Sequence, residues 1–358
     1  MKKKVMSALL AGAMLFALAA CGNNSSNGGN GGNAGGGSNG GGNSGAVIEL
    51  RMGNVTSSSA KDAVTEVFIP KVEEYSNGTI KITHFPDNQL GNDEQSFAMA
   101  QTGECDIAVG STSSVTTTYN DLYLYDIPYM FLNKQEVYEV GFNGEAGKAI
   151  LDGFSGYGLK GLAFWENGFR NVTTNNKDIA AVADLNGLKI RTMANEIHLE
   201  AWKAMGANPT PMAFGELFTA MQQGTVDGQE NPLGIITGNK FEEIEKFCTL
   251  TEHVYTPYYV VMNLEKWNSL TAEQQDALTR AMEETTQRQY ELSQKYEDEA
   301  VGVMEAAGCK VRTLTDEEKL SFKEAADKAN SLEAAKKIMY KPELADQMSE
   351  ELAAYRSK

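Results

Sequence analysis

Residues 187–232 constrain the fold more than any other part of this 358-residue chain, because their apolar residues recur with the periods of strands and helices in turn. Leu199, Trp202 and Met205 follow one another at three-residue steps, as on one face of a helix, and Gly206 marks its end. The pattern predicts, in order, a strand over 188–192, a helix over 196–205, an extended segment over 209–213, a second helix that stops at Gly224 and a strand over 226–229. This β-α-β-α-β order predicts an α/β fold.

Three side chains lie at or just beyond the ends of these predicted segments: Arg191, Phe214 and Asn231. Open α/β sheets bind ligands at the carboxyl ends of their strands, where such side chains converge. We therefore expect the three residues to share one pocket.

The rest of the chain continues the alternation of strands and helices. Pro70 should kink or divide a helix that ends at Tyr75, and the aromatic residues of 119–131 suit an extended segment under a cleft or, alternatively, ordinary core packing. A capping box at Thr271 and Gln274 opens a helix that runs to residue 307, with a length of roughly 50 Å. Because no single lobe is that wide, this helix should bridge two lobes. Further strands are predicted over 47–53, 79–85, 105–109 and 159–165, and further helices over 93–101 and after 315–318.

Three motifs occur in order within the opening stretch: GLKIR at 187–191, GANPTPM at 206–212 and DGQENP at 227–232. Shorter pieces stand at 88–91, 126–129 and 167–170. Together they closely resemble the solute receptors of tripartite ATP-independent periplasmic (TRAP) transporters, the C4-dicarboxylate-type family. The resemblance covers roughly residues 46–330.

This resemblance implies a two-lobed α/β clamshell of the periplasmic-binding-protein kind, with the long helix bridging both lobes. Lobe one would comprise 46–166 with a returning segment at about 256–290, and lobe two 167–255 with C-terminal helices at about 291–358. The function implied is a monomeric receptor, not an enzyme, that captures a C4-dicarboxylate or a sugar acid such as a uronate. It would deliver this ligand to the large and small membrane subunits of a transporter.

Two arginines are expected to meet the ligand's carboxylate. Arg191 is the first choice, because a guanidinium offers parallel N–H donors that match two carboxylate oxygens; a structural pairing with a Glu is the alternative. Arg170, in Gly168-Phe169-Arg170, stands where the family often places another cation, although it could be a rim charge.

The other predicted contacts are weaker. Asn231 supplies a side-chain amide, and Pro232 after it limits the backbone of Asn231 to extended conformations. Phe214 supplies an apolar wall or, alternatively, packs as a core aromatic. Ser111 replaces the Glu of the sialic-acid-binding branch that this chain resembles, which argues against sialic acid. The remaining predicted contacts are Asn54, Gln89, Trp165 and His198. Asn54 and Gln89 could instead be turn residues that cap their own backbone, and His198 could be a surface or core residue.

The N-terminal 45 residues have the features of a targeting and tethering segment. Lysines at 2–4 precede an apolar run, and Leu18-Ala19-Ala20-Cys21 resembles a bacterial lipobox, so 1–20 reads as a signal peptide and Cys21 as a lipid-modified anchor. A plain signal peptide is the alternative. Residues 22–45 contain only Gly, Asn, Ser and one Ala, a composition typical of a flexible tether. The protein would then sit on the extracytoplasmic face of the cytoplasmic membrane.

The net charge of −17 disfavours nucleic acid as a partner. An acidic chain that binds an anion must use local cations, and only Arg51, Arg170 and Arg191 precede residue 280 among the arginines. Two of these three lie in the motifs described above.

Enzyme signatures in the chain fail on context. The GxGxxG match at 156–161 follows a helical pattern instead of a strand, and His84, His198 and His253 are far apart without an HExxH motif, so no cofactor or zinc is expected. Cys105, Cys248 and Cys309 lack a CxxC motif and should be buried thiols, with one disulfide as the alternative. A chemosensory receptor and, less favoured, a secreted hydrolase are the competing functions.

Overall fold

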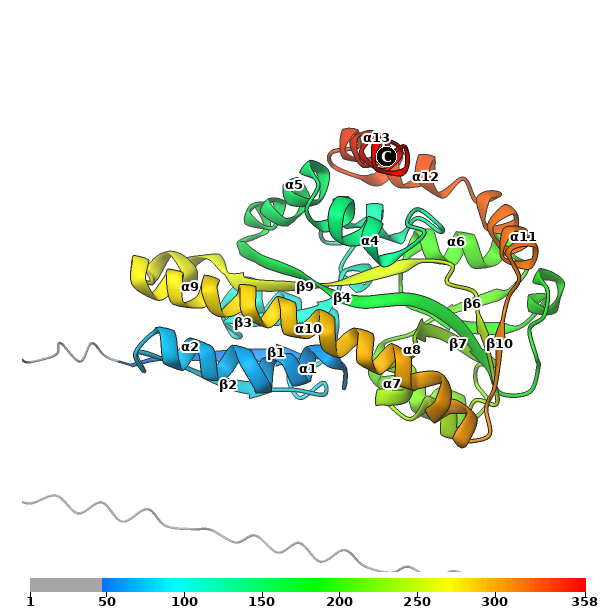
Figure 1. Ribbon diagram of the computed structural model, residues 1–358, viewed down its shortest axis with the longest axis horizontal. Coiled ribbons are helices and arrows are strands. Elements are labelled where there is room, and N and C mark those ends of the chain that lie inside the picture. The colour runs from blue at the N-terminus through cyan, green and yellow to red at the C-terminus, as the bar shows by residue number, and fades with distance from the viewer. Residues whose placement is uncertain (1–46) are drawn as a thin grey trace, which may run out of the picture. The chain divides into compact units, whose positions relative to one another are not determined.

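The computed structural model describes residues 47–358, in which one mixed sheet is covered by helices (Figure 1). The strand order is β2-β1-β3-β9-β4-β7-β5-β6, and β8 pairs with β4 and β10 off this path. The predicted α/β class is therefore confirmed. The predicted signal peptide over 1–20, the anchor Cys21 and the tether over 22–45 lie outside the described residues.

The first part of the sheet contains three parallel strands: β1 (Ile48–Asn54), β2 (Ile80–Phe85) and β3 (Ile107–Ser111). Pro70 lies in the first turn of α2, where it lacks the N–H that an α-helical bond to the preceding turn requires. The π-helical turn η1 precedes it directly, so the helix is divided as predicted. The helical connections in this part are α1 (Ser59–Ala63), η1 (Val64–Phe68), α2 (Ile69–Tyr75) and α3 (Asp93–Thr102).

The second part of the sheet is the predicted β-α-β-α-β unit. Its three parallel strands are β5 (Lys189–Thr192), β6 (Asn208–Pro211) and β7 (Gly228–Pro232), with β5 in the middle. The helices α6 (Glu196–Ala204) and α7 (Phe214–Gln222) connect them, and the predicted boundaries differ by only a few residues. The carboxyl ends of β5 and β7 meet at one edge, and these strands carry Arg191 and Asn231.

One long strand, β4 (Leu159–Thr174), runs through both parts of the sheet and pairs antiparallel with its neighbours. It pairs with β9 (Tyr255–Asn263) along its first two thirds and with β7 and β8 along the remainder. The strand predicted to end at 165 therefore continues past the predicted lobe boundary near 167. Its pairing with β9 shifts register between Glu166 and Gly168, and Gly168 has a φ of 125°, which favours glycine.

The long predicted helix is confirmed as α10 (Ala272–Ala306), which at 35 residues measures about 52 Å. It packs against α1, η1 and α2 in the first part, and against α8 (Leu233–Gly238) and β10 (Lys310–Thr313) in the second (Figure 1). Buried Gln289 fastens it to β4: its Oε1 accepts from Glu166 N at 2.9 Å, and its Nε2 donates to Glu166 O at 2.7 Å. The bridging prediction is therefore confirmed.

The prediction of an extended segment over 119–131 is wrong, because residues Asn120–Asp126 form the 3₁₀-helix η3. With about three residues per turn, Leu122 and Tyr125 lie on one face, and both are fully buried in the core with Tyr119. An extended chain would turn alternate side chains away from that core. The aromatic residues of this segment pack in the core, which was the alternative interpretation.

The C-terminal helices divide their contacts between the two parts of the sheet, whereas the sequence assigned them to lobe two alone. α11 (Asp316–Asp327) packs on α6, and α12 (Ser331–Ile338) packs on α6 and η3. α13 (Glu343–Arg356) instead packs on α5 (Glu145–Gly153) and η4 (Val137–Phe142), because Leu344, Met348 and Leu352 join the aromatic core around η3.

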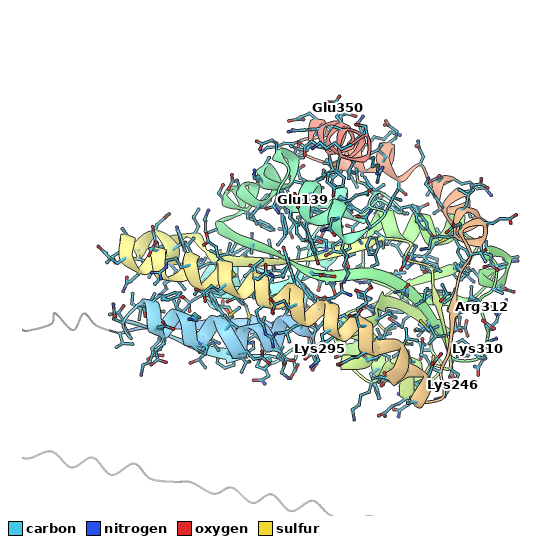
Figure 2. The ribbon with its side chains drawn as sticks, in the orientation of Figure 1. Glu139, Lys246, Lys295, Lys310, Arg312 and Glu350 are labelled. Atoms are coloured by element: carbon cyan, nitrogen blue, oxygen red, sulfur yellow. The ribbon has the colours of Figure 1, made fainter. Side chains whose placement is uncertain are left out.

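Ion pairs attach β10 to Asp178, in the segment between β4 and β5: Lys310 Nζ and Arg312 Nη2 lie 2.5 Å and 2.8 Å from Asp178 Oδ2. Figure 2 labels Lys310 and Arg312 on this strand. The described thiols of Cys105, Cys248 and Cys309 are free and buried.

Within residues 47–358, no helix is both long and apolar enough to cross a membrane. The remaining elements are η2 (Thr112–Ser114), α4 (Lys134–Glu136), η5 (Phe154–Tyr157), η6 (Val182–Leu185), η7 (Phe241–Glu243), β8 (Phe247–Leu250) and α9 (Leu264–Ser269).

Candidate functional site

Arg191 occupies the carboxyl-terminal half of β5 and is almost fully buried, at 1% exposure. Its Nε and Nη2 donate to the carbonyl oxygen of Met212, at 3.0 Å and 2.6 Å. Its Nη1 is buried without any hydrogen-bond partner. Burial lowers the pKa of Arg191 to about 10, against the attraction of Glu230, so the guanidinium is charged at neutral pH.

Arg191 lines a cavity of about 390 Å³, which is at the small end of the usual range for ligand sites. The walls come from both parts of the sheet, since Asp93, Glu94 and Ser114 belong to the first part and Phe214 belongs to α7. The structure therefore brings Arg191 and Phe214 to one cavity, whereas Asn231, which was expected to share it, is not among the residues that line it. The other lining residues are Met193, Ala194, Pro211, Met212, Ala213 and Glu216.

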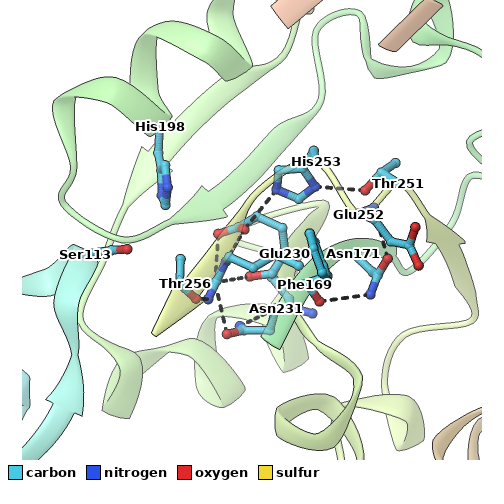
Figure 3. A network of polar contacts seen from close by, with 12 residues as sticks. Ser113, Phe169, Asn171, His198, Glu230, Asn231, Thr251, Glu252, His253 and Thr256 are labelled. Carbon is cyan, nitrogen blue, oxygen red and sulfur yellow. Dashed lines mark hydrogen bonds and ion pairs between the residues drawn. The ribbon is translucent and has the colours of Figure 1, made fainter. Parts of the chain in front are cut away.

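Arg170 is also buried, at 1% exposure, so it is not the rim charge that the sequence allowed. Its Nε lies 2.5 Å from Glu230 Oε2, and its Nη2 donates to Glu230 Oε1 at 2.9 Å and to Asn231 Oδ1 at 3.0 Å. His253 Nε2 lies 3.2 Å from Glu230 Oε2 on the other side (Figure 3). A Glu thus neutralises Arg170 within the protein, whereas Arg191 has no such partner.

The hydrogen bonds around Arg170 also orient the Asn231 side chain and keep Glu230 ionised. The Asn231 amide donates from Nδ2 to Gln229 Oε1 at 2.5 Å, so both ends of the amide are bonded. Burial acts to raise the pKa of Glu230, but Arg170 and the hydrogen bond with His253 outweigh it and hold that pKa well below its usual range. The pair is a preformed internal ion pair beside the Arg191 cavity.

The remaining predicted contacts lie outside the cavity lining. Asn54 donates to Thr56 O at 2.8 Å and faces His84 Nε2 at 2.6 Å, and Gln89 is exposed in its turn. Trp165 is fully buried against α10, where its Nε1 donates to Thr286 Oγ1 at 2.8 Å. Asn54 thus matches its alternative as a residue that bonds its own turn, and Trp165 is a core residue.

His198 and Ser111 are both buried and polar, but differ in their distance from the site. His198 Nε2 lies 3.1 Å from Asp126 Oδ1 without hydrogen-bond geometry, and Figure 3 shows the ring apart from the Glu230 network. Ser111 donates its N–H to Asp93 Oδ1 at 2.9 Å, while its Oγ has no partner. Ser111 therefore lies directly behind a residue of the cavity wall.

Sequence reasoning missed the carboxylates of the cavity, above all Asp93. A signal existed, because Asn92 and Gln95 form a capping box that places Asp93 at the first position of α3, directly after the 88–91 motif. Among residues 47–358, no group of three or more His, Cys, Asp or Glu side chains could hold a metal ion.

Comparisons with known proteins identify the family to which the chain belongs. Residues 52–337 match the family described as DctP, bacterial extracellular solute-binding protein, family 7. The chain is 33% identical to the 2,3-diketo-L-gulonate-binding periplasmic protein YiaO of Escherichia coli strain K12, over 78% of this chain and 85% of that protein. It is 32% identical to the C4-dicarboxylate-binding periplasmic protein DctP of Rhodobacter capsulatus, over 70% of this chain and 76% of that protein.

A solved structure of a sugar acid binding protein has the same fold. The sugar acid binding protein DctPAm from Advenella mimigardefordensis strain DPN7T, in complex with galactonate, superposes with a TM-score of 0.82 at 32% identity. The match covers 86% of this chain and 99% of that one. The chain therefore belongs to the family-7 bacterial extracellular solute-binding proteins, the solute receptors of TRAP transporters.

Proposed function

We propose that Arg191 binds the carboxylate of a small organic acid in the cavity between α3 and α7, and that the protein passes this ligand unchanged to the large and small membrane subunits of a TRAP transporter. The observation that carries the proposal is the buried Nη1 of Arg191, which lacks a partner in a cavity wall. A buried donor on a charged group is costly to leave unsatisfied, and a ligand carboxylate would satisfy it.

The surroundings of Arg191 support this role over a structural one. The carbonyl of Met212 holds the guanidinium at two of its nitrogens and fixes its orientation without neutralising its charge. Arg170, by contrast, already has the carboxylate of Glu230. Of the two predicted cations, Arg191 is therefore the one without a salt-bridge partner among the described residues. Phe214 would supply an apolar wall, while Arg170 and Asn231 would support the site from behind.

Thermal unfolding and calorimetry test the proposal. A panel of small carboxylates, including C4-dicarboxylates, aldonates and uronates, should contain acids that raise the melting temperature of the protein. The matched control for each binder is its neutral primary amide, which keeps the shape but lacks the charge. Binding of the acid but not of the amide supports an ion pair between Arg191 and the ligand. Equal binding of both would contradict this ion pair.

We further propose that the mature protein is a lipoprotein held on the extracytoplasmic face of the membrane by Cys21. The support is the sequence order of apolar run, Leu18-Ala19-Ala20-Cys21 and tether. Cys21→Ser should move the protein from the membrane fraction to the soluble fraction. Intact-mass measurement of membrane-bound protein would contradict the proposal if it showed an unmodified Cys21.

A further inference from the structure

The charges that line the Arg191 cavity are unbalanced. Arg191 is the one cation among the described lining residues, whereas Asp93, Glu94 and Glu216 bring three carboxylates. Glu94 and Glu216 are exposed, so water and salt screen them. Asp93 is buried, at 7% exposure, and its charge is therefore the one that a bound ligand experiences most strongly.

Asp93 is held rigidly by the first part of the sheet. It is the first residue of α3, its Oδ1 accepts from Ser111 N at 2.9 Å, and its Oδ2 accepts from Ser114 Oγ at 3.4 Å. A carboxylate in a first helical turn is ordinarily explained by the helix dipole, but Glu94 serves that purpose from an exposed position. Burial raises the pKa of Asp93 to about 6, so the buried carboxylate reduces stability at neutral pH.

Among the described residues, Arg191 Nη1 is a buried donor of the cavity lining without a partner, and a carboxylate satisfies it. Asp93 is the buried carboxylate of the same lining, and a ligand hydroxyl can donate to it. Ser111 Oγ also lacks a partner among the described residues, but Ser111 lies behind Asp93 and outside the lining.

We infer that the ligand is a monocarboxylate with hydroxyl groups beyond its carboxylate, and that Asp93 selects it against dicarboxylates. The inference rests on the proposed function, because it takes Arg191 as the partner of the ligand's carboxylate. A ligand hydroxyl can donate to Asp93, while a second carboxylate would meet that like charge with no further cation in the described lining. Family membership does not decide this point, since the relatives named above include a sugar-acid receptor and a C4-dicarboxylate receptor.

Pairs of acids that differ only at the far end test the inference. Erythronate and meso-tartrate form one pair, and galactonate and galactarate form another; each pair replaces a terminal CH₂OH by a carboxylate. Calorimetry on the full protein should show the diacid binding at least about 100-fold more weakly than the monoacid. In Asp93→Asn, which keeps an oxygen to accept from Ser111, the ratio should fall to within about 10-fold.

Glu104→Gln is the matched control, because it removes an exposed carboxylate that lies between α3 and β3, outside the cavity lining; it should change the ratio by less than about 3-fold. Tighter or equal binding of the diacids, tightest binding of an amino acid, or an unchanged ratio in a folded Asp93→Asn variant would each overturn the inference. If Asp93→Asn does not fold, the wild-type ratio alone decides. Failure of every organic acid to bind would instead overturn the proposed function, and this inference with it.

Discussion

Arg191 needs the geometry of a guanidinium as well as its charge. Nε and Nη2 are used on Met212, and only Nη1 is left for a ligand, so a lysine could not hold both partners in the same arrangement. We expect Arg191→Lys to weaken binding of the ligand acid by about 2 to 4 kcal/mol, which is roughly 30-fold to 1000-fold in Kd. Calorimetry with an acid from the panel measures the loss.

The control for this substitution is Arg51→Lys, which makes the same change at an exposed arginine of β1. Its Kd should remain within about 2-fold of wild type. Circular dichroism establishes that both variants are folded. Near wild-type affinity in a folded Arg191→Lys variant would exclude Arg191 from the site.

Glu245 should make the free energy of unfolding depend on pH. It is 1% exposed, and burial raises its pKa from 4.5 to about 8, so the folded protein keeps it neutral where the unfolded chain ionises it. The stability from the neutral form is complete below about pH 4.5 and is lost as the pH rises toward about 8, at about 1.4 kcal/mol per pH unit. Glu245→Gln should remove this dependence.

Urea unfolding at several pH values between these limits measures it. The unfolding free energy of Glu245→Gln should rise relative to that of wild type as the pH increases. The exposed neighbour Glu243→Gln should follow wild type throughout. A constant difference between Glu245→Gln and wild type would mean that Glu245 is not neutral in the folded state.

The sequence could single out Arg191 as a candidate site residue but could not separate it from Arg170. Both lie in family motifs, and only the packing shows that Glu230 pairs with Arg170 and leaves Arg191 Nη1 without a partner. Asp93 was missed because nothing in its local sequence marks it as a buried residue. An acidic residue after a capping residue is a common helix start, and its burial depends on strand β3, which is distant in sequence.

At the scale of elements, prediction succeeded where local signals agree. The second part of the sheet has regular periodicity and glycine stops, and α10 and α11 begin with capping boxes at Thr271 and Thr315. It failed where long-range packing decides. Residues 120–126 form η3 because their aromatic side chains fill a core that α13 completes from the far end of the chain. Similarly, β4 extends past 165 because β7 and β8 supply partners.

The junction of α10 with β4 depends on one amide. Gln289 satisfies both backbone groups of Glu166, beside the register shift in β4, and also donates to Ser59 Oγ at 2.9 Å. Gln289→Ala should leave buried polar groups unpaired and lower the unfolding free energy by roughly 2 to 4 kcal/mol. Urea unfolding measures this loss.

Gln287→Ala, which changes an exposed glutamine on the same helix, is the matched control and should stay within about 0.5 kcal/mol of wild type. Equal stability of the two variants would show that α10 is held to β4 by its apolar contacts alone.

At the scale of the whole body, the two parts of the sheet are joined by few continuous elements. β4 and α10 cross between them, and the pairing of β4 with β9 is irregular between Glu166 and Gly168, where the crossing occurs. Irregular strand positions can absorb changes in φ and ψ that a regular ladder cannot. The cavity walls come from both sides of this junction, so a ligand that contacts both walls would favour a closed arrangement.

Small-angle scattering should therefore show a smaller radius of gyration when a ligand acid saturates the protein. The change requires contacts to both walls: in the proposed site, Arg191 would hold the carboxylate from one wall, and Asp93 would accept from the ligand's hydroxyl groups from the other. The neutral amide of the same acid, at the same concentration, should leave the radius at its ligand-free value. Asp93→Asn should still bind the acid through Arg191 but close less completely, because it loses the charge-assisted contact on one wall. An unchanged radius in wild-type protein that calorimetry shows to be saturated would mean that the two walls are already closed, and that Asp93 selects the ligand within a rigid cavity.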